Sequence, residues 1–192
     1  MLSPLCQGAK MKSLKNLANY PFSLPLIADE ILEFHAARLI LLLHICGTND
    51  MVNGLTKMAK LDFFIRYPEF FAFASQVLEN KVVPSKEHVE SYMVRYHYGP
   101  WDQRYYHVLA YLEARQLIQV MKDNKTYNLT LTKDGNKIAK ELENDDNYLD
   151  LVMQMHMVSK LLGNKNGAYL KNLIYKLFDK RVGSLSLGEP IK

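Results

Sequence analysis

The chain has 192 residues, of which 48% are hydrophobic and 23% charged, and its formal net charge is +4. This composition supplies a packed core and excludes a disordered chain. The longest apolar run, residues 39–45, is far shorter than the roughly 20 residues of a membrane-spanning helix, so we expect no contact with a membrane. Lys10, Lys12 and Lys15 argue against a secretory signal, which makes the cytoplasm the expected compartment.

The beginning of the chain predicts an arm followed by a helix. Residues 1–28 contain three prolines and three lysines but no acidic residue, a composition that favours an extended arm. A first helix is expected over residues 29–46, where Gly47 follows its end. The last turns of this helix are apolar on every face, which predicts burial.

Two further helices are expected before residue 80. The second covers residues 57–67, with Thr56 as its cap, and leaves three cationic side chains facing solvent: Lys57, Lys60 and Arg66. Pro68 ends it and begins a third helix over residues 69–78. Because the third helix is apolar on nearly every face, two interpretations stay open: burial under the C-terminal helices, or an interface with a protein partner.

Residues 85–96 fit either a helix or a strand, since short segments cannot be separated by periodicity alone; we favour a helix. Gly99-Pro100 then breaks the chain, and Asp102 is the expected cap of a helix that reaches about Gln116. The apolar spacing of this helix predicts one buried stripe, made of Tyr105, Val108, Leu109 and Leu112.

A β-hairpin and another helix follow. Residues 117–121 and 127–131 are β-prone and flank a turn-rich Lys-Asp-Asn-Lys connection. Thr132 is the expected cap of a helix over residues 133–143. Helix, hairpin and helix in this order are typical of the second half of a winged helix-turn-helix.

The predicted fold is mainly α with a small β-hairpin, and it has three parts. Two C-terminal helices are expected over residues 148–162 and 168–178, followed by an extended tail over residues 182–192. The parts are an extended N-terminal arm (1–28), a winged-helix domain (29–144), and a C-terminal helical extension with its tail (145–192).

No catalytic or metal-binding pattern is found in the sequence. The nine glycines form no phosphate-binding loop, and the six histidines and two cysteines lack metal-ligand spacing. Cys46 is interpreted as a core residue and Cys6 as a thiol without a role. We therefore expect no catalytic residue, no metal and no cofactor, and a protein that is not an enzyme.

An aromatic cluster within the predicted winged-helix domain is the most notable group of candidate binding residues. It allows three interpretations: packing between helices, a protein interface, or stacking on nucleic acid. The cluster consists of Tyr92, Tyr96, Tyr98, Trp101, Tyr105 and Tyr106, interleaved with Arg95, His97 and Arg104. Residues 29–144 carry 14 basic and 15 acidic residues, whereas residues 151–192 carry seven basic and two acidic ones. Since phosphate contacts supply most nonspecific duplex affinity, a nearly neutral winged-helix region favours a protein partner.

Four stretches together resemble one family. They are HAARLILLL (35–43), GLTKMAKLDFFIRYP (54–68), MVRYHYGPWDQRYY (93–106) and GAYLKNLIYKLF (167–178). The chain resembles the middle components of three-component ABC (Lamassu-type) anti-phage defence systems. The resemblance implies a noncatalytic subunit that binds an SMC/Rad50-like ATPase and a nuclease-type effector, restrains the effector until foreign DNA is sensed, and meets DNA mainly through the complex.

Two functional hypotheses follow. In the first, the protein is an adaptor, whose expected partner-binding residues are Phe70, Phe71, Phe73, Val77, Tyr96, Tyr98, Trp101 and Arg104. In the second, it is a winged-helix transcriptional regulator or antitoxin, in which Gln103, Arg104 and His107 contact bases while Lys122 and Lys125 contact phosphates. Weak duplex binding is expected through Lys171, Lys176, Lys180 and Arg181. We expect Trp101 to be buried between its helix and the first one.

Overall fold

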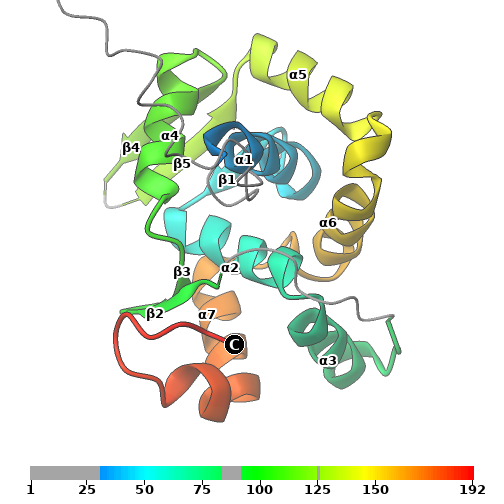
Figure 1. The fold of residues 1–192 in the computed structure, drawn as a ribbon, viewed down its shortest axis with the longest axis vertical. Helices are drawn as coiled ribbons and strands as arrows, with labels where there is room; N and C mark the ends of the chain where they lie inside the picture. The colour runs from blue at the N-terminus through cyan, green and yellow to red at the C-terminus, as the bar shows by residue number, and fades with distance from the viewer. Residues whose placement is uncertain (1–30, 84–91, 125) are drawn as a thin grey trace, which may run out of the picture.

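The computed structural model describes residues 31–83, 92–124 and 126–192 (Figure 1). Over these ranges the chain is mainly helical with a small antiparallel sheet, as predicted. The helices are α1 (Leu32–Cys46), α2 (Leu55–Arg66), α3 (Pro68–Glu79), α4 (Tyr105–Ala114), α5 (Lys133–Glu143), α6 (Leu149–Leu162) and α7 (Gly167–Phe178). The strands are β1 (Met51–Asn53), β2 (Val94–Tyr96), β3 (Gly99–Trp101), β4 (Ile118–Asp123) and β5 (Thr126–Leu131). The predicted arm over residues 1–28, with Cys6, lies outside the described ranges.

Helix α1 forms the centre of the molecule. Figure 1 shows it surrounded by α2, α4, α5 and α6, each of which packs against it. Residues 35–43 are consequently all buried, and so is Cys46. The predicted burial of the apolar end of this helix is confirmed. His35 and Arg38 share that burial.

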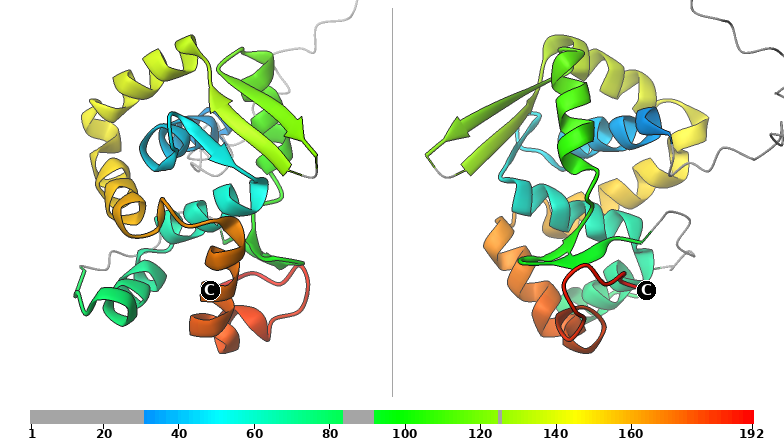
Figure 2. Two further views of the ribbon diagram at one scale, coloured as in Figure 1. Left: turned by 180° about the vertical axis from the view of Figure 1, so that it is seen from behind. Right: turned by 60° about the vertical axis from the view of Figure 1, so that its left-hand side comes forward.

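The three-stranded sheet has the order β1-β5-β4. Strands β4 and β5 pair antiparallel from Ile118 opposite Leu131 to Asp123 opposite Thr126, which confirms the predicted hairpin. Figure 2 shows this hairpin extending away from the helices. The sequence did not predict β1, because three residues are too few to display an alternation of period two.

Helices α4 and α5 match the predictions closely. The buried stripe of α4 consists of the four residues predicted for it: Tyr105, Val108, Leu109 and Leu112. Helix α5 has its predicted bounds, and the side chain of Thr132 accepts from the backbone N–H of Gly135 at 3.0 Å. The predicted Thr132 cap is therefore confirmed.

The chain between α3 and α4 differs from its prediction. Residues 94–96 form a strand that pairs antiparallel with β3, so a helix through residue 96 is wrong, while residues 85–91 lie outside the described ranges. The turn requires Gly99 at φ +96°, a backbone conformation that residues with a Cβ rarely adopt. Strand β2 also pairs on its other edge, which stabilises an extended backbone there.

That second pairing comes from the tail, which was predicted to be extended but without any contact assigned to it. After a π-helical turn over Asp179–Gly183, the chain returns to β2. The N–H of Arg95 donates to the carbonyl of Glu189 at 2.9 Å, and the N–H of Ile191 donates to the carbonyl of Met93 at 2.8 Å. Since Ile191 is fully buried, the tail is docked against the fold.

Helix α2 begins at Leu55 after Gly54 and has no side-chain cap, so the predicted Thr56 cap is wrong. The prediction that Lys57, Lys60 and Arg66 face solvent is also wrong, because all three are buried. Helix α2 packs against α1, α3, α6, α7 and β3, which leaves it no free face. Within the described ranges, no helix has the length and apolarity needed to cross a membrane.

Candidate functional site

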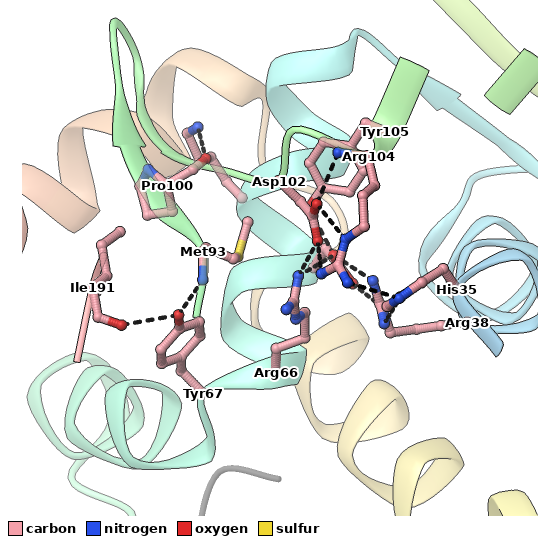
Figure 3. Close-up of polar contacts among 12 residues, drawn as sticks. His35, Arg38, Arg66, Tyr67, Met93, Pro100, Asp102, Arg104, Tyr105 and Ile191 are labelled. Atoms are coloured by element: carbon pink, nitrogen blue, oxygen red, sulfur yellow. Dashed lines mark hydrogen bonds and ion pairs between the residues drawn. The ribbon is translucent and has the colours of Figure 1, made fainter. Parts of the chain in front are cut away.

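The β2–β3 hairpin is held on the body of the protein by two polar anchors (Figure 3). Lys60 Nζ donates to the carbonyl of Pro100 at 2.8 Å. The hydroxyl of Tyr67 accepts from the N–H of Met93 at 2.6 Å and donates to the carbonyl of Ile191 at 3.1 Å. These bonds join α2, the hairpin and the tail, so the hairpin has a fixed position.

A buried ionic cluster lies where the hairpin meets α4. Arg66 Nη1 and Arg104 Nη2 each donate to Asp102 Oδ2 at 2.7 Å, and Arg104 Nε donates to Asp102 Oδ1 at 2.9 Å. Burial alone would raise the pKa of Asp102, but the hydrogen bond from Arg104 and the charge of Arg66 hold that pKa below its usual value. Asp102 is therefore ionised at physiological pH.

Asp102 was predicted to cap the helix that follows, and its observed contacts differ. Helix α4 begins at Tyr105, and its N-cap residue is Arg104. Asp102 Oδ1 accepts from the backbone N–H of Arg104 at 2.9 Å, ahead of the helix. The main contacts of Asp102 are thus with two guanidinium groups, which tie α4 to α2.

The cluster continues into α1 through Asp62. Arg38 Nε donates to Asp62 Oδ1 at 2.9 Å, and the Tyr105 hydroxyl donates to Asp62 Oδ2 at 2.7 Å. Burial, with the negative charge of Asp62, raises the pKa of Tyr105. The ring nitrogens of His35 lie 3.0 Å from Arg38 Nη1 and 2.9 Å from Arg104 Nη1 (Figure 3). Hydrogen bonds between polar and charged side chains thus join α1, α2 and α4. They fix the positions of these three helices relative to one another.

Exposed rings cover the outer side of the hairpin and the start of α4. Tyr98 and Tyr106 are 63% and 65% exposed, and Tyr96 is 46% exposed. Trp101 is half-buried, so its expected full burial is wrong. Its ring packs edge-on against Tyr105 at a centroid distance of 5.0 Å and also contacts Tyr96 and Tyr106.

These rings line a pocket of about 380 Å³ between the hairpin, the start of α2 and β5. Its described lining residues are Asn53, Gly54, Leu55, Thr56, Lys57, Lys60, Tyr96, Tyr98, Gly99, Trp101, Tyr106, Thr126, Tyr127 and Gly167. Burial, joined by the charge of Lys171, lowers the pKa of Lys60 to about 7. The volume falls in the range of roughly 300–1,000 Å³ that is usual for small-molecule sites.

Helix α3 divides the predicted partner-binding residues into two groups. Phe70 and Phe71 are buried, so they cannot contact a partner in this conformation. The ring of Phe70 packs on that of Phe178 of α7, with 4.7 Å between the ring centroids. Phe73 and Val77 are 48% and 52% exposed. Burial is therefore confirmed for one face of this helix, while a protein interface on the exposed face stays a prediction.

The residues predicted to contact DNA lie on separate elements. Gln103 and His107 are exposed beside α4, whereas Arg104 takes part in the buried cluster. Lys122 Nζ lies 5.9 Å from the ring centroid of Tyr127, and Lys125 lies outside the described residues. Four further predicted DNA contacts lie in α7 or just after it: Lys171, Lys176, Lys180 and Arg181. The guanidinium carbon of Arg181 lies 4.1 Å from the ring centroid of Phe70.

Comparison with known proteins gives no relative. No protein-family model, no curated protein and no solved structure matches this chain. Function must therefore be argued from the chain itself.

The ionic cluster and the pocket were missed at the sequence level. One signal was present, because His35 and Arg38 lie one turn apart and are the only polar residues over positions 34–43, and Asp62 lies between Leu61 and Phe63. Opposite charges on apolar faces of two helices indicate a buried ion pair. In the part of the chain that the structure describes, no group of three or more His, Cys, Asp or Glu side chains is placed to hold a metal ion.

Proposed function

We propose that this protein is a noncatalytic adaptor of a Lamassu-type anti-phage defence complex, with a winged-helix core. In this role it bridges an SMC/Rad50-like ATPase and a nuclease-type effector in the cytoplasm, and it meets DNA mainly through the complex. The resemblance of residues 35–43, 54–68, 93–106 and 167–178 to middle components of these systems supports the proposal.

The winged-helix core is supported by the element order. Helix α1, strand β1, helix α2, helix α4 and the β4–β5 hairpin follow one another, with β1 beside β5. This order is compatible with a winged helix, and in the proposed core α3 and the β2–β3 hairpin are insertions. Of the two inserted elements, helix α3 carries the exposed apolar face on which the adaptor role depends.

The observation that carries the proposal is the exposed apolar face of α3. Phe73, Val77 and Leu78 lie exposed on one helix, and Val82 just beyond it is 88% exposed. A second apolar stripe runs along α6, where exposed Leu149 and Met153 are followed one turn later by half-buried Met157. Exposed apolar surfaces of this kind are typical of protein interfaces, and a bridging subunit needs two.

Copurification with the products of the neighbouring genes tests this function. We expect the wild-type chain to capture a long coiled-coil ATPase and an effector, and Phe73→Ser with Val77→Ser to abolish capture of one of them while the protein still folds. Met121→Ser is the matched control, because Met121 is equally exposed but lies on β4. Capture of neither neighbour by the wild type would contradict the adaptor role.

The alternative is a DNA-binding regulator or antitoxin with the same core. Its support is the exposure of Gln103 and His107 at the start of α4, where a recognition helix contacts bases. The contact of Arg104 with Asp102 and His35 disfavours it, because this guanidinium would have to leave the cluster to reach a base.

A further inference from the structure

The pocket beside the β2–β3 hairpin has aromatic walls. Leu55 is the one aliphatic residue among its described lining residues, whereas five of them carry rings: Tyr96, Tyr98, Trp101, Tyr106 and Tyr127. The rings come from three segments, namely the hairpin, the start of α4 and β5. Flat π-faces with so little aliphatic surface suit a planar ring such as a nucleobase, and stacking accepts every base.

The same pocket has basic and no acidic side chains among its described lining residues, and Lys60, with a pKa of about 7, is partly protonated at neutral pH. Lys57 and Lys60 are among its described lining residues, and no aspartate or glutamate is. Lys171 of α7 lies near enough for its charge to act on Lys60, and Lys122 lies against the ring of Tyr127. Lysines without neighbouring carboxylates attract an anion. A ligand that combines a planar ring with a negative charge therefore matches both properties.

The start of α2 adds to this positive potential. Gly54 is the N-cap residue of α2 and has no side chain that could accept from the first N–H groups of the helix. Gly54, Leu55 and Thr56 all line the pocket. A helix N-terminus carries partial positive charge, which favours a phosphate next to the rings and the lysines.

We propose that this pocket binds an unstacked base of a single-stranded nucleic acid, with the base on Trp101 and the neighbouring tyrosines and the adjoining phosphate facing Lys60 and Lys171. In this proposal Tyr96, Tyr98 and Trp101 stack on nucleic acid, which is one of the three interpretations that the sequence left open. Gln103 and His107, the base-reading residues of the regulator alternative, are not among the described lining residues. The inference goes beyond the adaptor role and is independent of it, because the exposed faces of α3 and α6 take no part.

Trp101 provides the test, since it is the one tryptophan of the chain. The full chain is titrated with an oligothymidylate roughly ten nucleotides long, and tryptophan fluorescence is recorded. We expect saturable quenching whose midpoint moves to higher oligonucleotide concentration as salt is added. An abasic strand of equal length should bind about tenfold more weakly or worse, and so should thymidine monophosphate and a duplex of that length.

Several results would overturn the proposal. Equal affinity for the abasic strand would show that phosphates alone are bound. Equal affinity for thymidine monophosphate would make the ligand a free nucleotide, and equal affinity for the duplex would remove the need for an unstacked base. Binding without any change in Trp101 fluorescence would place the strand elsewhere on the protein.

Substitutions locate the site. Tyr98→Ala and Tyr106→Ala should each weaken oligothymidylate binding by about 5- to 150-fold, the range for loss of one stacking ring. Tyr169→Ala is the matched control, because Tyr169 is an exposed tyrosine on α7 that does not line the pocket. Lys60→Met should also weaken binding. If these three pocket variants melt cooperatively and bind as tightly as Tyr169→Ala, the assignment is wrong.

Discussion

Asp102 is the residue on which the junction of hairpin and helix α4 depends most. It accepts from Arg66 and Arg104, and its side chain is almost entirely buried. Replacing it by Ala leaves Arg66 charged and buried without this carboxylate, and we expect a loss of roughly 3–5 kcal/mol of unfolding free energy. Urea denaturation measures this loss. Asp123→Ala, at an exposed position on β4, is the control and should change stability by less than about 0.5 kcal/mol.

The same carboxylate predicts a pH dependence. Because the pKa of Asp102 is lower in the folded protein than in the unfolded chain, its ionised form contributes stability that is complete above about pH 4, near the pKa of an unfolded Asp. This contribution is lost as pH falls further toward the folded pKa. As pH falls below about 4, the free energy of unfolding of Asp102→Asn should therefore decrease less than that of the wild type. Parallel acid titrations followed by circular dichroism would refute this if the two curves differ by a constant amount.

Lys60 has the opposite effect on stability. Its pKa of about 7 in the folded protein lies below the roughly 10.4 of an unfolded lysine, so the unfolded chain binds the proton more tightly. The resulting penalty is complete below about pH 7 and disappears as pH rises toward about 10. Lys60→Met should be more stable than the wild type by roughly 1–3 kcal/mol at pH 6, after the lost bond to Pro100 is deducted.

Thermal melts of wild type and Lys60→Met across this pH range measure the effect, and the difference should shrink as pH rises. A constant difference, or a variant less stable at pH 6, would show that Lys60 is not a desolvated cation. Compared with the wild type, Lys60→Met should have a higher free energy of unfolding and a lower affinity for oligothymidylate. A merely misfolded variant would lose both.

At the scale of the single element, helix α3 has one buried face and one exposed face. Phe70 is buried against Phe178 and Phe73 is 48% exposed, although both are phenylalanines on one apolar helix. Phe70→Ala should cost roughly 3–5 kcal/mol. Phe73→Ser should change stability by about 1 kcal/mol or less and reduce self-association of the isolated protein. Urea denaturation and analytical ultracentrifugation separate the two effects; equal losses of stability would contradict the assigned faces.

Elements with strong local signals were predicted to within a few residues. The β4–β5 hairpin, the Thr132 cap and the two C-terminal helices follow from turn chemistry and periodicity, which act over a few residues. Strand β2 was predicted as the end of a helix, with a strand as the alternative, because its extended conformation depends on Gly99 and on pairing with residues 188–191, far along the chain. Such distant pairing leaves no local signal.

At the scale of the whole molecule, burial of charge was the main error. Lys57, Lys60 and Arg66 were assigned to solvent by the periodicity of one helix, which cannot reveal that α2 is covered on every side. The pocket was missed for a related reason. Its walls come from α2, the β2–β3 hairpin, α4 and β5, and only the tertiary fold brings them together. Tyr96, Tyr98 and Tyr106 were recognised as candidate binding residues, but Tyr127 was not.

The adaptor and the regulator differ in how the whole chain should treat duplex DNA. With 14 basic and 15 acidic residues in residues 29–144, we expect the isolated protein to bind duplexes weakly and without sequence preference. Gln103→Ala and His107→Ala should then leave duplex binding unchanged. These exposed positions test base contact better than Arg104 does, because replacing Arg104 also disrupts the buried cluster.

Electrophoretic mobility shifts with the protein's own promoter at physiological salt measure this binding. A tight, sequence-specific complex that either substitution weakens would favour the regulator. Capture of protein partners should persist at moderate salt, since apolar contacts are not screened as exposed ion pairs are.

The long-range anchors of the hairpin have a consequence for synthesis on the ribosome. Arg66 meets Asp102 after a further 36 residues have been added, and the hydroxyl of Tyr67 meets Ile191 after 124. At about 5–20 residues per second, the last partner of this segment is synthesised roughly 6–25 seconds later. Aromatic and charged groups destined for the interior stay exposed to water during that time. The nascent chain is thus a substrate for chaperones that bind emerging apolar segments, and codon changes that slow translation between residues 102 and 191 should lower the yield of native protein.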